Sequence, residues 1–222
     1  MSIRKKNLNL LKKNYIYDEK MEHDSCGVGL VASTEGLKSR KVVENGIEAL
    51  KAVWHRGAID ADGKTGDGAG IHIEIPKDFF ADKIEITGHK HDNSEICVGM
   101  IFLPRNDYEA QEQCRTIIES ELTKKNFNIY GWRQVPVNPS VLGEKAEQTR
   151  PEITQVLFTN NDKAINDKSL ESKLYETRRR IEKEALKKQL KNFYICSFSS
   201  KSIIYKGMFL AEALSDFYPD LK

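Results

Sequence analysis

The order of apolar patterns between residues 95 and 198 constrains the fold of this chain more than any other feature. Alternating or continuous apolar runs predict strands, and apolar residues that return every three or four positions predict helices. In chain order the patterns predict a strand at 96–103, a helix over about 110–122, strands near 128–135 and at 153–159, a charged helix over about 168–190 and a strand at 193–198. This β-α-β-β-α-β order is typical of a ferredoxin-like lobe. We therefore expect an α+β chain with an inserted lobe at 95–198.

The part of the chain before this lobe divides at Cys26. Residues 1–25 are polar, and the formal net charge of +2 comes from them, so we interpret 1–25 as a leader. The small apolar run at 26–32 predicts a buried strand whose glycines admit close backbone approach. A helix follows with Val43, Ile47, Leu50 and Trp54 on one face, and a glycine- and aspartate-rich loop at 60–70 leads to a strand at 71–75.

Composition limits the classes of function. The body of the chain is neutral by count, and the basic residues near Arg178 alternate with Glu176, Glu182 and Glu184, which indicates a solvated helix face and no nucleic-acid partner. The four cysteines lack metal-site spacing, so we expect no bound metal. No apolar run is long enough to span a bilayer, and residues 1–25 lack the apolar stretch of a signal peptide. We expect a cytoplasmic protein without a membrane partner.

Cys26 is the candidate nucleophile. An isolated cysteine is more often a buried structural residue. If the chain is cut before Cys26, however, the residue acquires an α-amino group with a pKa of about 7.7–8.0. That amine can act as general base toward the thiol of the same residue, so nucleophile and base need no distant partner.

The loop at 60–70 resembles two ligand-binding motifs without matching either. Asp60 and Asp62 begin like a calcium loop, but Lys64 and Thr65 break the pattern. The glycines suggest a phosphate-binding turn, but such turns lead into a helix and this one leads into a strand. We predict a tight connection that brings backbone close to the strand at 26–32.

Several segments together resemble a known family. They are CGVGLVAS at 26–33, GIEALKAVWHRGAIDADGKTGDGAGIHIEIP at 46–76, YGWRQVPVN at 130–138, GEKAEQTRPEI at 143–153, and FYPDL at 217–221. They are similar to the class II, N-terminal-nucleophile glutamine amidotransferase domain of glutamate synthase. The resemblance covers 26–222 and implies the αββα sandwich of N-terminal-nucleophile hydrolases, of which this chain would hold the first part.

The resemblance also implies residues and partners. Cys26 matches the family nucleophile, and Arg56 and Gly57 match the HRG element beside it. L-glutamine would be the substrate. The partners would be the remaining glutamate synthase domains, with FMN and an iron–sulfur cluster outside this chain, and a small electron-donor subunit is a further candidate.

The family's other substrate-binding residues are an arginine for the glutamine carboxylate, an Asn-Gly pair for the oxyanion and an aspartate for the amine. They match nothing in 1–222. We therefore expect the isolated chain to be incomplete and inactive. The alternative is a non-catalytic remnant or an interaction module.

Overall fold

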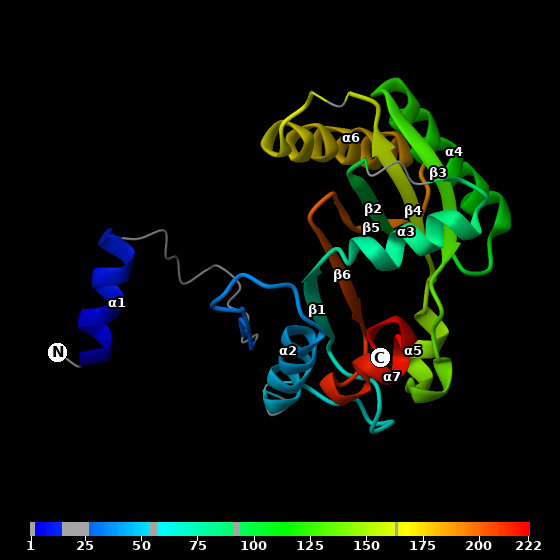
Figure 1. Cartoon of the computed structure of the whole chain (residues 1–222). Coiled ribbons are helices and arrows are strands. Elements are labelled where there is room, and N and C mark those ends of the chain that lie inside the picture. The colour runs from blue at the N-terminus through cyan, green and yellow to red at the C-terminus, as the bar shows by residue number, and fades with distance from the viewer. Residues whose placement is uncertain (1–2, 15–26, 54–56, 91–93, 163) are drawn as a thin grey trace.

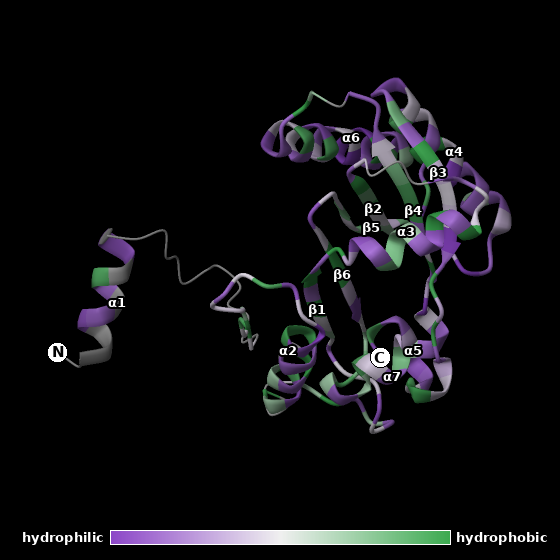
Figure 2. Cartoon of the chain, viewed as in Figure 1, coloured by the Kyte–Doolittle hydropathy of each residue, from purple (hydrophilic) through white to green (hydrophobic). Residues whose placement is uncertain are grey.

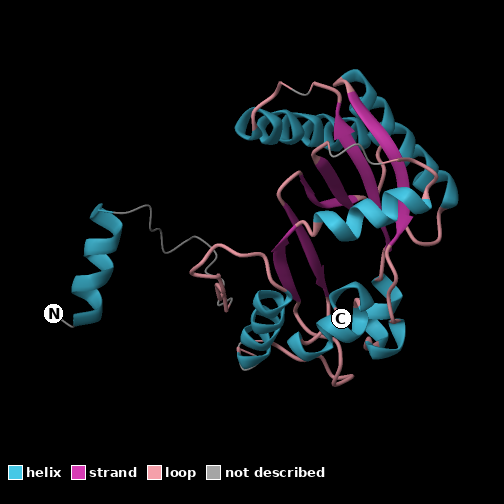
Figure 3. Cartoon of the chain, in the orientation of Figure 1, coloured by secondary structure: helices cyan, strands magenta, loops and turns pink. Residues whose placement is uncertain are grey.

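The structure is a computed structural model that describes residues 3–14, 27–53, 57–90, 94–162 and 164–222. It contains two antiparallel sheets with helices around them (Figures 1 and 3). The helix α1, Ile3–Asn14, lies apart from the main body in Figure 1. Within the described residues the chain is therefore α+β, as the sequence predicts.

A four-stranded sheet forms the larger half of the molecule. Its strands are β2 (Ile96–Leu103), β3 (Phe127–Gln134), β4 (Glu152–Asn160) and β5 (Tyr194–Ser199). They lie in the order β3-β4-β2-β5, and every neighbouring pair is antiparallel. The two central strands β2 and β4 are buried on both faces, which explains why their sequences are continuous apolar runs and not alternating ones.

One face of this sheet is covered by the helices α4, Tyr108–Lys124, and α6, Asp167–Lys187. Asp107 caps α4 by accepting a hydrogen bond from the Ala110 backbone N–H, and Asn166 caps α6 in the same way from Ser169. The residues of α6 that face the sheet are those of its apolar stripe: Leu170, Leu174, Thr177, Ile181 and Ala185. Figure 2 shows apolar strands enclosed by helices whose outer sides are polar.

The opposite face packs against a second core. It is formed by the helix α3, Lys77–Ile86, by the strand β6, Ser202–Gly207, and by the C-terminal residues 209–221. Phe80 and Ile84 of α3 are completely buried there. The sequence patterns did not predict α3.

A two-stranded sheet pairs β1, Ala69–Glu74, with β6. The helix α2, Arg40–Ala52, packs on it, and Ile47 is its most buried residue. The predicted face Val43, Ile47 and Leu50 is confirmed as part of the core, whereas Trp54 lies outside the described residues. The helix ends at Ala52.

Residues 27–33 form no strand, which corrects the prediction of a buried strand at 26–32. Val28 and Leu30 are 91% and 92% exposed. An extended apolar segment becomes a stable strand only when neighbouring strands take its backbone hydrogen bonds. None of the described strands pairs with residues 27–33.

The C-terminal part of the chain is a series of short turns of helix. They are Ala211–Ala213, α7 at Leu214–Phe217 and Pro219–Leu221. Two further short helices, at Pro139–Val141 and α5 at Glu144–Thr149, connect β3 to β4.

Candidate functional site

The structure describes only one of the three predicted site residues. Cys26 and Arg56 lie outside the described residues. Gly57 is described and exposed, and it begins the glycine- and aspartate-rich segment that leads to β1. The geometry around the candidate site is therefore that of the chain leaving Gly57.

This chain forms a small hairpin over 58–67. Ile59 and Gly66 make an antiparallel bridge. The Asp60 N–H donates to the Thr65 carbonyl at 2.9 Å, and the Asp67 N–H donates to the Ala58 carbonyl at 3.3 Å. The predicted tight connection is thus a closed hairpin whose base lies directly beside Gly57, followed by β1.

The hairpin tip is closed by Asp62 and Thr65. One oxygen of the Asp62 carboxylate accepts hydrogen bonds from the backbone N–H groups of Lys64 and Thr65, at 2.9 and 2.7 Å. The other accepts from the Thr65 hydroxyl at 2.5 Å. The hydroxyl and the two N–H groups hold the pKa of the Asp62 carboxyl well below its usual range. The carboxylate therefore accepts three hydrogen bonds within the tip.

The tip docks on the segment around α5, which is remote in sequence. A Cβ atom at Gly143 would lie 2.2 Å from Asp62 Oδ2 and 2.3 Å from Thr65 Oγ1, so only glycine allows this approach. Thr65 is 2% exposed, and its hydroxyl oxygen accepts a long hydrogen bond from the Ala146 N–H at 3.4 Å. An ion pair of 2.7 Å joins Lys145 to Asp60 at the rim. Two of the quoted motifs, at 55–70 and at 143–153, thus form one contact.

The other side of the hairpin is held by the chain after β6. A Cβ atom at Gly66 would lie 2.7 Å from the carbonyl oxygen of Phe209, which is itself buried. The hairpin is therefore packed on both sides. Sequence reasoning did not find Thr65, Gly143 or Phe209 as partners of the site.

α5 is in turn fixed to the four-stranded sheet. Arg105, just after β2, donates to both the carboxylate and the backbone carbonyl of Glu147, at 2.6 and 3.1 Å. Arg150 donates to the other oxygen of the same carboxylate at 2.7 Å. Arg150 and then Arg105 lower the pKa of Glu147. The ion pairs connect the sheet through α5 to the hairpin.

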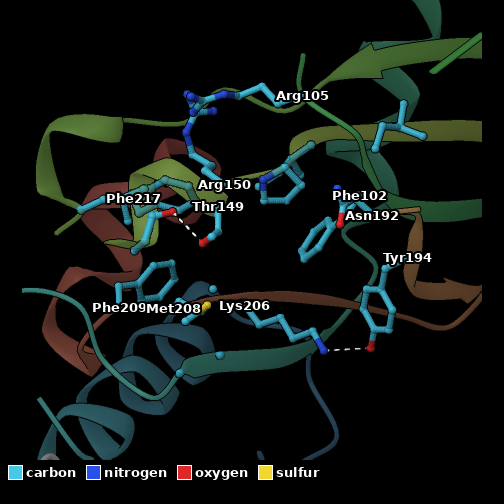
Figure 4. A pocket seen from close by; sticks show the side chains of 18 of the residues that line it. Phe102, Arg105, Thr149, Arg150, Asn192, Tyr194, Lys206, Met208, Phe209 and Phe217 are labelled. Atoms are coloured by element: carbon cyan, nitrogen blue, oxygen red, sulfur yellow. Dashed lines mark hydrogen bonds between the residues drawn. The ribbon is translucent and has the colours of Figure 1, made fainter. Parts of the chain in front are cut away.

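A cavity of about 1150 Å³ opens beside these elements (Figure 4). Asp67 and Gly68 at the end of the hairpin line it, together with β1, β6, the end of β2 and α5. Its walls carry the aromatic rings of Phe102, Phe209 and Phe217. Lys206 donates to the Tyr194 hydroxyl at 2.8 Å across one side. The two arginines at its rim, Arg105 and Arg150, both form ion pairs with the single carboxylate of Glu147.

Two of the other quoted motifs meet through a buried ion pair. The guanidinium of Arg133 on β3 donates to both carboxylate oxygens of Asp220, at 2.7 Å each. Gln155 accepts a further hydrogen bond from Arg133, and Tyr205 donates to Asp220. This network attaches the C-terminal segment to the four-stranded sheet.

Comparison with known proteins identifies the family. Residues 26–222 match the family described as class II glutamine amidotransferases, and the match begins at Cys26. The chain belongs to this family. The chain is 57% identical over 205 residues to the glutamate synthase (NADPH) large chain of Azospirillum brasilense, and the alignment covers 92% of this chain and 14% of that protein.

Other relatives have lower identity. The chain is 38% identical to the ferredoxin-dependent glutamate synthase 2 of Synechocystis, over 90% of this chain and 13% of that protein. It is 39% identical to the ferredoxin-dependent glutamate synthase 1 of Arabidopsis thaliana over 90% of this chain and 12% of that protein. The chain thus spans a small part of the length of each of these relatives.

Two further observations bear on ligands and membranes. Among the described residues of the chain, no cluster of three or more His, Cys, Asp or Glu side chains has the arrangement of a metal site. The described helices include none with the length and hydropathy needed to cross a bilayer.

The three described cysteine thiols of the chain are buried, and we predict that they react slowly. Burial raises the pKa of Cys114 and of Cys196 to about 11 each, and it raises the pKa of Cys97 further. Because the thiolate is the reactive form, these three thiols should react slowly with a disulfide reagent at pH 8 in the folded protein. All four cysteines should react in denaturant. Fast reaction of two or more thiols in the folded protein would contradict this burial.

Proposed function

We propose that this chain is the glutaminase part of a glutamate synthase large subunit, with Cys26 as nucleophile. The observation that carries the proposal is the family match that begins at Cys26, together with the similarity to glutamate synthases over about nine tenths of the chain. The hairpin 58–67 supports it, because the motif most specific to glutamate synthases forms a closed and docked structure next to Gly57.

The proposed chemistry is acyl transfer through a thioester. The Cys26 thiol gives its proton to the α-amine of the same residue, and the sulfur bonds to the side-chain amide carbon of glutamine. The C–N bond breaks as the α-ammonium group returns the proton to the leaving nitrogen, which departs as ammonia. Water then attacks the thioester carbon, the C–S bond breaks, and glutamate and the free thiol are released.

The other elements receive these roles in the proposal. Residues 1–25 are a leader whose removal exposes the amine of Cys26. Arg56 and Gly57 support the nucleophile and the backbone next to it. The four-stranded unit within 95–198 is an inserted lobe with ferredoxin-like connectivity, which the strand order β3-β4-β2-β5 and the helices α4 and α6 on one face support.

The ammonia would be consumed by a synthase part of the same protein outside residues 1–222. FMN and an iron–sulfur cluster bound there would relay electrons from an external donor to the conversion of 2-oxoglutarate and ammonia to glutamate. The names of the relatives contain NADPH or ferredoxin, which we propose as the alternative electron sources. A small electron-donor subunit is a further candidate partner. We place the enzyme in the cytoplasm. The 222-residue chain without the rest of the substrate site is expected to be inactive.

The test is the N-terminus of the active protein. In the full-length natural protein, glutamine hydrolysis should appear together with a new N-terminus at Cys26, because only an N-terminal cysteine carries the required amine. Intact-mass measurement and N-terminal sequencing decide this. A variant with Ser25→Pro, which hinders cleavage before Cys26, should retain the leader and hydrolyse no glutamine. Full activity with residues 1–25 attached would refute the one-residue nucleophile and base.

A further inference from the structure

Three contacts order the hairpin 58–67. The Asp62–Thr65 closure lies within it, the approach of Gly143 to both side chains joins it to the inserted lobe, and Gly66 packs on Phe209 outside the lobe. We call the first two the Thr65 clasp, defined by Asp62, Thr65 and Gly143. Asp62 and Thr65 follow Gly57 by five and eight positions, whereas Gly143 comes from the segment around α5.

The clasp differs in burial from the other contact between the same segments. Thr65 is almost fully buried, and its hydroxyl both donates to Asp62 and accepts from Ala146. The Asp60–Lys145 ion pair at the rim is exposed, with 36% and 66% of the side chains accessible. Exposed ion pairs contribute little to fixing a geometry, whereas a buried hydroxyl with both donor and acceptor partners has no alternative partner in water.

The clasp is connected to a rigid support. Gly143 and Ala146 belong to the α5 segment, whose Glu147 is held by Arg105 at the end of β2 and by Arg150. β2 is a central strand of the sheet and is almost entirely buried. The position of the hairpin base, and with it the backbone at Gly57, is therefore set by the lobe through α5.

We propose that Thr65 is a positioning residue for the glutaminase reaction, and that the inserted lobe acts on the site by holding the hairpin through the Thr65 clasp. This inference rests on the proposed function. The hairpin base is continuous in the chain with Arg56 and Gly57, to which the proposed function assigns the support of Cys26, so loss of the clasp would disturb that support. Thr65 touches neither substrate nor the reacting atoms, and it acts only through the chain that it holds.

The experiment compares Thr65→Val with Thr65→Ser in the full-length natural protein. Valine keeps the shape but removes the hydroxyl, and we expect glutamine-dependent kcat/KM to fall at least about tenfold, since small misplacements near reacting groups cost that much. Glutamate formation from added ammonia should stay within about twofold of wild type, because that reaction bypasses glutamine hydrolysis. Thr65→Ser restores the hydroxyl and should recover most of the glutamine-dependent rate. Gly143→Ala, which places a Cβ into the clasp, should reproduce the loss seen with valine.

Two control variants separate positioning from stability. Thr177→Val removes another buried hydroxyl, which donates to the Lys173 carbonyl in α6, far along the chain from the hairpin. It should lower the thermal midpoint about as much as Thr65→Val does while leaving the glutamine-dependent rate unchanged. Lys145→Ala removes only the exposed rim ion pair and should change the rate by less than about twofold.

The results that overturn the inference are distinct from those that overturn the proposed function. A wild-type glutamine-dependent rate in Thr65→Val, or an equal loss in Thr177→Val, would show that the hydroxyl is only a structural group. An equal loss of the ammonia-dependent rate would place the damage outside the glutaminase step. Wild-type protein without any glutamine hydrolysis would overturn the proposed function and this inference with it.

Discussion

Replacement of Asp220 by alanine should destabilise the protein by about 3–5 kcal/mol, because it leaves the buried guanidinium of Arg133 without its carboxylate. The two side chains are only 14% and 6% exposed, and the ion pair is bidentate. Gln155 can satisfy one N–H of Arg133 but cannot neutralise its charge. Urea unfolding at pH 7 measures the loss.

The C-terminal segment cannot avoid this cost by detaching. Tyr218 and Leu221 on either side of Asp220 are 0% and 2% exposed, and Tyr218 donates a hydrogen bond to the Lys206 carbonyl. Release of the segment would expose both side chains to water. The free-energy cost of that exposure exceeds the gain from hydrating the unpaired guanidinium. Glu184→Ala is the matched control, because its ion pair with Lys187 is exposed, and it should leave the urea midpoint almost unchanged. A loss below about 1 kcal/mol in Asp220→Ala would mean that the pair is open in solution.

The four-stranded unit was predictable because its signals are local. β2 and β4 are continuous apolar runs, and α6 has an apolar stripe that repeats every three or four residues over 21 residues. Each of these elements also finds its partners within residues 96–199. Pattern and tertiary structure therefore agree, and the predicted boundaries are close to the observed ones.

The elements that the sequence patterns missed have weak or non-local signals. α5 is six residues long, and only Ala146 is buried, so it shows no apolar period. α3 has a weak signal: Phe80 and Ile84 are four residues apart, and Pro76 is at its N-cap. The segment at 27–33 has the pattern of a strand, but no described strand pairs with it. Whether a segment pairs depends on the strands next to it and not on its own residues.

The candidate site divides in the same way. Cys26, Arg56 and Gly57 follow from one short motif each and from the family resemblance, and the structure does not test their roles. The Thr65 clasp could not be predicted, because Thr65 and Ala146 lie 81 positions apart and nothing in either segment specifies the other. The requirement for glycine at 143 is visible only once Asp62 and Thr65 are seen against it.

The prediction with the largest effect concerns Cys26. In the full-length natural protein, Cys26→Ala should lower glutamine-dependent glutamate formation by at least about 10³-fold, because both the nucleophile and the base that it holds in position act through this residue. Alanine retains an α-amine but offers no sulfur for the thioester. Glutamate formation from added ammonia should persist at the wild-type rate, since that reaction needs no glutamine hydrolysis.

Cys114→Ala is the matched control for this change. Cys114 is completely buried in α4 against the four-stranded sheet, and burial keeps its thiol protonated. Its loss should cost some stability and leave both glutamine-dependent and ammonia-dependent rates unchanged. If ammonia fails to support glutamate formation in Cys26→Ala, the substitution has damaged more than the glutaminase step. If glutamine supports glutamate formation in Cys26→Ala as well as in wild type, Cys26 is not the nucleophile. Cys26 would then be a structural cysteine.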